Sequence, residues 1–398
     1  MKKIGNSFSG IIGGIIFIII GVVLLWWNEG NNVKNLKTTA EMSKTVINVS
    51  SDKIDPQNEG KLIATNGKVT NEEELSDSLF NVTIKTPLLK RIVEVYQWEE
   101  ESNTDSDNHT TYTYHKVWKS DLIDSSSFNK SGYDNPTTKE YDDTEYASTL
   151  VNVGAFELSD EQIRSLSTEG VYNSFDEAKV TEMNYTVSGN YVTNSKDINK
   201  PEIGDVRIQY VYNNSTELSV LAVQNGHSFK TFVSQAGKKV NRVMDGIKSG
   251  EEMINVIKTE NKILKWVLRL VGVIAVIAGV AALFKPLSTI ASFVPILGGL
   301  VDMAVGLVAF ILGLAISLVV ISIAWIRFRP VLGIGLLVVV AALVFILIKK
   351  SKSKKSETVN MQVTPEIPEV KENNSNNTDV TPEIPEVKEN NQDNNIQL

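Results

Sequence analysis

The stretch WVLRLVGVIAVIAGVAALF at residues 266–284 opens an apolar block that continues to Ile348. A bilayer core about 30 Å thick requires roughly 20 apolar residues of helix. Two further runs in this block are long enough, at 303–325 and at 330–348. The charged residues inside the block are Arg269, Lys285, Asp302, Arg327 and Arg329. We therefore predict a membrane protein with three transmembrane helices in this part of the chain.

A first crossing is predicted at 8–27, FSGIIGGIIFIIIGVVLLWW, which follows a short N-terminus at 1–7. The alternative is a cleaved signal peptide, whose apolar region spans about 7–15 residues and ends at small residues. This run is longer and ends on Trp26-Trp27, as expected at a membrane interface. We interpret it as a retained signal anchor. Its glycines at 10, 14 and 21 share a helix face and predict close packing on another helix.

The composition of the chain argues against several classes of function. The 398 residues carry a formal net charge of −8, which does not favour nucleic acid as a partner because phosphate binding needs clustered Lys and Arg. The chain has no cysteine, which excludes disulfides, thiolate metal sites and cysteine nucleophiles.

Residues 28–247 lack an apolar run long enough to cross a membrane, and several segments alternate as strands do. The strand candidates are 61–65, 91–99, 111–119, 179–187, 206–212 and 218–223. A helix is predicted after Ser159, where Ser159 and Gln162 have capping-box spacing. We predict a large β-rich extracytoplasmic domain. Aromatic residues alternate along 91–99 and 111–119, and we expect them to pack across strands, with a binding platform as the alternative.

No constellation of catalytic, cofactor-binding or metal-binding residues is predicted. Asp105 and Asp107 suggest a calcium loop, but the sixth and twelfth positions would be Thr110 and Lys116 instead of Gly and Glu. The histidines, at 109, 115 and 227, lack zinc-site spacing. An enzyme would require converging carboxylates, or His115 and His227 in one cleft.

Residues 248–265 are predicted to form an amphipathic helix that runs into the crossing at 266–284. Small residues repeat along this crossing and along 303–325, and we expect these two helices to pack closely. The segment 285–302 contains two prolines and a Gly pair and is predicted to be interfacial or re-entrant. For Arg269 and Asp302 we favour a structural ion pair or headgroup contact over an ion path.

The ends of the chain indicate the orientation. Five lysines at 349–355 follow the crossing at 330–348, and Lys2 and Lys3 precede the first. By the positive-inside rule both termini are cytoplasmic, although Arg327, Arg329, Lys262 and Lys265 argue the other way. The tail at 349–398 repeats VTPEIPEVKENN and is predicted to be disordered.

With these landmarks placed, the chain resembles the transmembrane protein 43 (LUMA) family. The matching segments are WWNEG at 26–30, PQNEGKLI at 56–63, VEVYQWEEE at 93–101, YTYHKVWKSDLIDSSSFN at 112–129, Asn135-Pro136, PEIGDVRIQY at 201–210 and WIRFRP at 325–330. The resemblance implies one anchor, a large lumenal or exported domain and three later crossings. Eukaryotic members look like membrane scaffolds of the endoplasmic reticulum and nuclear envelope, with no accepted catalytic residues. The Asn- and Lys-rich composition is similar to that of a bacterial member, whose site would be the cell membrane.

The predicted fold is thus an α+β membrane protein with four transmembrane α-helices, a β-rich extracytoplasmic domain and a disordered tail. The predicted function is a non-enzymatic scaffold or organiser of membrane proteins. It would act in the lipid bilayer as a homo-oligomer with other membrane proteins as partners and without a cofactor. The alternatives are a channel or transporter component and an extracytoplasmic enzyme.

Overall fold

The computed structural model describes residues 2–104, 110–291, 298–328, 330, 334–335 and 338–346. The chain divides into two units, Met1–Ala341 and Ala342–Leu398. Of the second unit, 342–346 are described and are helical. The predicted tail at 349–398 lies outside the described residues. The predicted fourth crossing at 330–348 is described only in part, so it stays a prediction.

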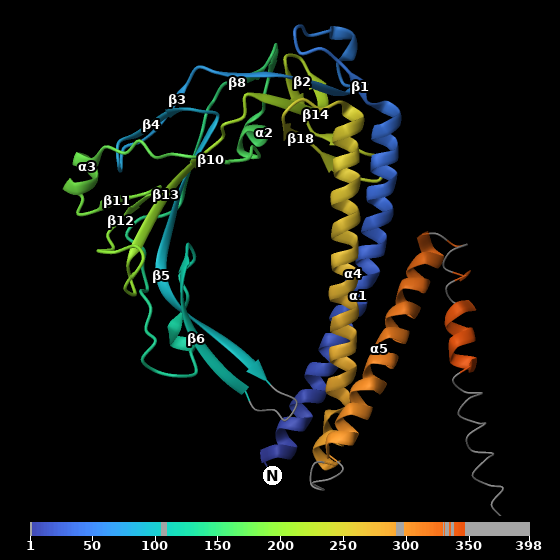
Figure 1. The fold of residues 1–398 in the computed structure, drawn as a ribbon. Coiled ribbons are helices and arrows are strands. Elements are labelled where there is room, and N and C mark those ends of the chain that lie inside the picture. Colours follow the sequence, from blue (N-terminus) through green and yellow to red (C-terminus); the bar gives the residue numbers. More distant parts are fainter. Residues whose placement is uncertain are drawn as a thin grey trace, which may run out of the picture. The chain divides into compact units, whose positions relative to one another are not determined.

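Three long helices stand out in Figure 1, one before the strands and two after them. They are α1 (Lys2–Thr45), α4 (Gly250–Ala291) and α5 (Gly298–Phe328). Each contains a window long and apolar enough to cross a membrane. Helix α4 unites the predicted amphipathic segment with the crossing that follows it. It also continues to Ala291, through Pro286, into the segment predicted to be interfacial; 292–297 lie outside the described residues.

Helices α1 and α4 run antiparallel and pack through glycines. A Cβ atom placed on Gly14 would lie 2.8 Å from the carbonyl oxygen of Gly279, and one on Gly21 would lie 2.8 Å from that of Gly272. Only glycine allows backbones to approach this closely. The predicted packing role of the α1 glycine face is confirmed at Gly14 and Gly21, whereas a Cβ placed on Gly10 meets no atom of the described residues within 4 Å.

The predicted close packing of α4 on α5 is confirmed, since Val276 and Ala309 share one buried cluster, but the small-residue stripe of α4 lies against α1 instead. Gly272 and Gly279 face α1, where they meet Leu25 and Ile18, and do not face the small residues of α5. Helix α5 packs on another side of α4, with Gly313 against the Cα of Ile277. A stripe of small residues therefore indicates that a helix face is closely packed, but it does not identify which helix packs against it.

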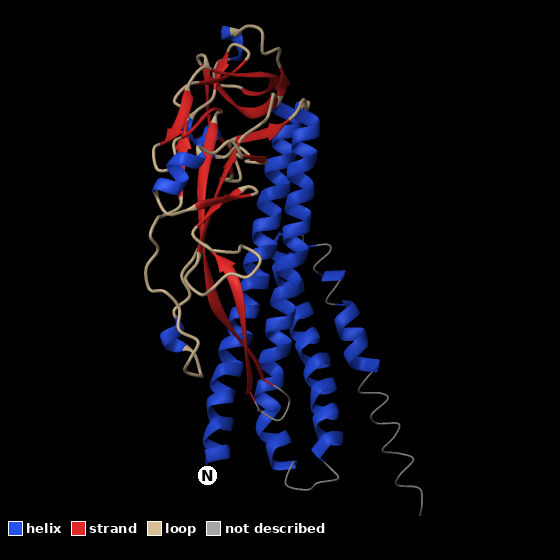
Figure 2. Cartoon of the chain, turned by 60° about the vertical axis from the view of Figure 1, so that its left-hand side comes forward, coloured by secondary structure: helices blue, strands red, loops and turns tan. Residues whose placement is uncertain are grey.

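In the sequence, the strands of the described residues lie between α1 and α4. Figure 2 draws them in red. A first sheet has the order β15-β14-β2-β8-β9, with β1 parallel to β2 and β18 beside β14. Its strands are β1 (Ile47–Asn48), β2 (Leu62–Asn71), β8 (Val151–Val153), β9 (Phe156–Glu157), β14 (Glu217–Asn225), β15 (Ser228–Lys230) and β18 (Arg242–Asp245). Its apolar core gathers Ile63, Phe156 and Leu218.

A second sheet has the order β11-β12-β13-β5-β6, with β10 beside β13 and β7 beside β5. Its strands are β5 (Leu88–Thr104), β6 (Thr110–Lys119), β7 (Thr144–Ala147), β10 (Gly170–Val171), β11 (Thr186–Ser188), β12 (Tyr191–Thr193) and β13 (Val206–Tyr212). Two small hairpins, β3 (Glu74–Asp77) with β4 (Val82–Lys85) and β16 (Phe232–Val233) with β17 (Lys239–Val240), complete the strands. Short helices are α2 (Asp160–Arg164), α3 (Glu177–Glu182) and the 3-10 turns Pro56–Asn58 and Ser125–Ser127.

The β-rich fold is confirmed, and most strand candidates lie in strands. The capping box is also confirmed: Ser159 and Gln162 exchange side-chain and backbone hydrogen bonds at the start of α2. The strand predicted at 179–187 was wrong, because α3 occupies its first part and β11 begins only at Thr186. Asp176 accepts hydrogen bonds from the backbone N–H groups of Ala178 and Lys179, and this N-cap outweighs the alternating pattern.

The first sheet rests on the ends of α1 and α4. Met42 of α1 and Met253 and Ile254 of α4 are fully buried in one cluster with Leu62 and Leu221. The Gly250 N–H also donates to the Asn48 side chain at 2.7 Å. The chain therefore enters the domain from α1 and leaves it through α4, and both helices continue into apolar spans.

Candidate functional site: a polar junction of three helices

Tryptophans lie where the apolar runs of the three helices end. Trp26 and Trp27 end the run on α1, Trp266 begins the run on α4, and Trp325 lies near the end of α5. Amphipathic tryptophan rings favour the headgroup level of a bilayer. This level marks the border between the spans and the domain-side parts of α1 and α4.

A buried ion pair joins all three helices at this border. Glu29 of α1 is 1% exposed. Arg269 of α4 donates from Nε at 2.5 Å and from Nη2 at 2.8 Å to the two oxygens of this carboxylate. The indole N–H of Trp325 on α5 donates to the same carboxylate at 2.6 Å. The bidentate fork fixes the orientation of both side chains as well as their distance.

Aromatic rings surround the guanidinium. The Arg269 Cζ lies 4.8 Å from the centroid of the Trp266 ring and 5.5 Å from that of Trp325. Cation–π contacts add to the ion pair where water is excluded. A buried charge without a partner would be energetically costly. The neighbouring side chains give the Arg269 guanidinium contacts that lipid acyl chains cannot provide.

Asparagines of α1 extend this polar contact towards the domain. Asn28 is 1% exposed, and its amide donates to the carbonyl of Lys265 at 3.0 Å. About two helical turns further along α1, the Asn35 amide donates to Asn261 at 2.7 Å. The polar contacts fix the register of α1 against α4 just outside the apolar spans.

The structure refines the predictions for charged membrane residues. Arg269 does form a structural ion pair, as expected, but its partner Glu29 was not predicted. The side chain of Asp302 lies outside the described residues. Glu29 belongs to the WWNEG segment and Trp325 to the WIRFRP segment, which sequence reasoning used only as marks of resemblance. A carboxylate directly after an apolar run was the available signal.

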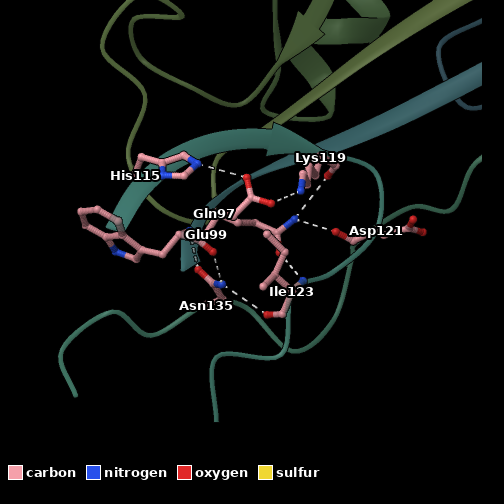
Figure 3. Close-up of polar contacts among 8 residues, drawn as sticks. Gln97, Glu99, His115, Lys119, Asp121, Ile123 and Asn135 are labelled. Atoms are coloured by element: carbon pink, nitrogen blue, oxygen red, sulfur yellow. Dashed lines mark hydrogen bonds and ion pairs between the residues drawn. The ribbon is translucent and has the colours of Figure 1, made fainter. Parts of the chain in front are cut away.

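The β5–β6 hairpin carries a second polar cluster (Figure 3). Gln97 is fully buried; its amide donates to the Asp121 carbonyl at 3.0 Å and accepts from the Ile123 N–H at 2.8 Å. Asn135 exchanges hydrogen bonds with the backbone of Trp98, at 2.7 and 2.8 Å. These amides hold the 120–135 loop on β5, which is a structural role.

Beside them, Glu99 contacts Lys119 and, at 3.2 Å, His115. The hydrogen bond from Lys119 lowers the pKa of Glu99. The second histidine of the enzyme alternative, His227, contacts Glu157 at 3.2 Å in the other sheet. The structure therefore does not bring His115 and His227 together, while Asp105, Asp107 and His109 lie outside the described residues. Among the residues that are described, no group of three or more His, Asp or Glu could hold a metal ion.

The aromatic residues of the hairpin pack against one another. Tyr96 and Trp118 are opposite in register, with ring centroids 5.1 Å apart. Tyr133 from the following loop stacks on Tyr114 at 3.7 Å and meets Trp98 edge-on at 4.9 Å. Cross-strand packing is confirmed, and loop residues cover the face that a binding platform would need.

Comparisons with known proteins place these features in a family. A family model described as Transmembrane protein 43 matches residues 95–330. The chain is 25% identical to Transmembrane protein 43 of Homo sapiens and of Pongo abelii over 380 residues, which covers 90% of this chain and 94% of each relative. It is 26% identical to the Drosophila melanogaster homolog over 341 residues, 81% of this chain and 90% of that protein.

No solved structure matches the chain. The family match includes both the β5–β6 hairpin and Trp325, and the longer alignments cover most of the chain. The chain belongs to the transmembrane protein 43 family of membrane proteins.

Proposed function

We propose that this protein is a non-enzymatic scaffold that presents its β-rich domain at a membrane and organises other membrane proteins there. The observation that supports this most directly is the continuity of α1 and α4. Each helix runs without a break from an apolar span into the buried cluster of Met42, Met253 and Leu221 under the first sheet. A domain held by two helices, with no loop between domain and span, has a restricted orientation towards the bilayer.

The junction of Glu29, Arg269 and Trp325 supports the same role. Both oxygens of the Glu29 carboxylate accept hydrogen bonds from the neighbouring helices, so the carboxylate has no free position for acid–base chemistry. The junction also removes Arg269 from the polar path that the transport alternative needs. The three helices gain a fixed arrangement, which suits a protein that holds other proteins in place.

The proposed orientation puts the domain outside the cytoplasm, in the cell membrane of a bacterial member. The lysines at both ends of the chain support it. We further propose self-association and contacts with other membrane proteins, since α5 presents large apolar side chains such as Leu307 and Phe310, 60% and 52% exposed. These surfaces face lipid or a neighbouring helix.

Single-cysteine variants test the role, because the chain has no cysteine of its own. Leu150→Cys and Val233→Cys place a thiol at exposed positions of the domain, and Val82→Cys places one in its core as a matched control. Crosslinking of intact membranes with a bismaleimide should give reproducible higher-mass species for the exposed positions alone. The scaffold proposal would be contradicted if every variant with an exposed thiol, and Leu307→Cys on α5 as well, gave only monomers after crosslinking.

The same variants test the orientation. A membrane-impermeant maleimide added to intact cells should label Leu150→Cys before lysis. Labelling that begins only after lysis would reverse the proposed topology.

A further inference from the structure

A groove of about 1720 Å³ follows α1 across the tryptophan level. One face of α1 forms its floor, and its walls are the turn between β16 and β17 and the last residues of α5, Arg327 and Phe328. The junction of Glu29 and Arg269 does not line this groove. The groove is therefore a separate feature that the proposed scaffold role does not use.

The floor of the groove is apolar towards one end of this helix face and positively charged towards the other. Val23, Trp27, Gly30, Lys34 and Lys37 follow one another at spacings of three and four, so they share one face of α1. The first two are apolar and lie in the membrane-spanning run, and the last two are exposed cations on the domain side of the tryptophans. A phospholipid has the same order, with acyl chains below a charged headgroup.

The domain-side part of the groove is cationic. Its charged lining consists of Lys34, Lys37, Lys44, Lys238 and Arg327 against the single carboxylate of Glu41. Glu41 accepts a hydrogen bond from the Gln235 N–H at 2.9 Å. Within the described part of the chain, Lys34, Lys37 and Arg327 form no ion pair with a carboxylate.

Side-chain contacts hold the walls in place. The hydroxyls of Ser234 and Thr38 lie 2.7 Å apart, and Lys238 Nζ donates to the Asn31 amide oxygen at 2.5 Å. At the other wall the Phe328 ring lies 6.4 Å from that of Trp26, and its Cζ is 3.2 Å from a Cβ placed on Gly30. A groove formed in advance loses little conformational entropy when a ligand binds.

We propose that this groove binds one anionic phospholipid from the leaflet on the domain side of the membrane. Lys34, Lys37 and Arg327 contact the phosphate and headgroup, and Arg327 supplies the planar fork that suits a phosphate. The acyl chains lie along Val23 and Trp27. Each Lys or Arg near an anionic membrane surface adds to the attraction, whereas a zwitterionic lipid gains little.

The test uses the full-length protein in a neutral detergent, stripped of lipid and titrated with phosphatidylglycerol or phosphatidylcholine. Bound lipid is counted by native mass spectrometry. We expect phosphatidylglycerol to bind at least about tenfold more tightly than phosphatidylcholine. The triple variant Lys34→Gln/Lys37→Gln/Arg327→Gln should reduce this preference to about twofold or less, and Lys34→Arg/Lys37→Arg should keep it.

The matched control removes three exposed lysines elsewhere on the domain, Lys53→Gln/Lys196→Gln/Lys230→Gln, and should keep the preference. Unchanged size-exclusion profiles show that the variants fold. If the triple variant does not fold, Lys34→Gln and Lys37→Gln are measured singly, each with an expected loss of about threefold.

Several outcomes would overturn the proposal. They are equal binding of the two lipids, a preference that survives the triple variant, and an equal loss in the control. Displacement of the lipid by millimolar inorganic phosphate would assign the groove to free phosphate, and displacement by an oligoglutamate peptide would assign it to an acidic protein segment.

Discussion

Two buried carboxylates, one at the helix junction and one in the β-rich domain, have the same kinds of partners. Glu29 accepts from Arg269 and from the Trp325 N–H, and Asp77 of β3 accepts from Arg91 of β5 at 2.5 Å and from the Tyr210 hydroxyl of β13 at 2.9 Å. The carboxylates are 1% and 3% exposed, and both arginine side chains are 12% exposed.

The two arginines differ in what remains when the carboxylate is lost. Arg91 also donates to the Thr144 hydroxyl at 2.7 Å and to the Asp142 carbonyl at 3.2 Å. In the described structure, the hydrogen bonds of Arg269 go to Glu29 alone. The loop before β7 and the side chain of its first residue supply these spare acceptors, whereas helix carbonyls already accept from backbone N–H groups. The junction therefore depends on a single residue, and the domain does not.

The largest effect is expected for Glu29→Gln. This change removes the charge that compensates buried Arg269 and leaves one amide oxygen in place of the two carboxylate oxygens that accept from it, which should cost about 3–5 kcal/mol. Denaturant unfolding in detergent, followed by tryptophan fluorescence, measures the loss. The double variant Glu29→Gln/Arg269→Gln should regain part of it because the buried charge is gone. Additive effects of the two single changes would contradict a direct pair.

A smaller effect is expected for Asp77→Asn, about 1.5–3 kcal/mol, because Arg91 keeps two acceptors. The asparagine oxygen can still accept from Tyr210, whose pKa is raised by burial and by the neighbouring Asp77, so the hydroxyl stays a donor. The same unfolding measurement checks this value. A loss as large as that of Glu29→Gln would show that the spare acceptors of Arg91 do not matter.

The helix crossing below the junction should be still less sensitive. Gly21→Ala places a Cβ 2.7 Å from Val276 and 2.8 Å from the Gly272 carbonyl, so α1 and α4 must separate at a cost of about 1–3 kcal/mol. Gly13→Ala is the matched control on the same helix, because its Cβ would meet no atom of the described residues within 4 Å, and it should be neutral or stabilising. Equal effects of the two would contradict the glycine contact.

The features that could be predicted from the sequence are those that local residue patterns determine. Apolar length predicted the spans at 8–27, 266–284 and 303–325, and alternation predicted β5, β6 and β13. The error at 179–187 has a local cause, since Asp176 lies just outside the alternating window and caps a helix there. No local pattern could pair Glu29 with Arg269, because 240 positions separate them and the glycine contacts between α1 and α4 set their register.

A partly exposed carboxylate completes the comparison and should show the smallest effect. Glu99 on the hairpin accepts from Lys119, and this hydrogen bond lowers its pKa below the ordinary value of 4.5. A lowered pKa in the folded state means that the pair stabilises the fold above pH 4.5 and that this contribution disappears as the pH falls through the folded pKa. Glu99→Gln should therefore lower the denaturation midpoint slightly at pH 7, and this effect should shrink as the pH is lowered through the folded pKa of Glu99.

Salt should weaken the partly exposed pair of Glu99 and Lys119 more than the buried pair of Glu29 and Arg269. Ionic strength of about 1 M shortens the screening length to about 3 Å, so the small difference between wild type and Glu99→Gln at pH 7 should vanish. The difference caused by Glu29→Gln should persist, because water and ions do not reach a carboxylate that is 1% exposed. Midpoints measured in low and high salt for both variants check this contrast. If the Glu29→Gln difference faded with salt as well, the carboxylate would be open to solvent, and the comparison between junction and hairpin would no longer hold.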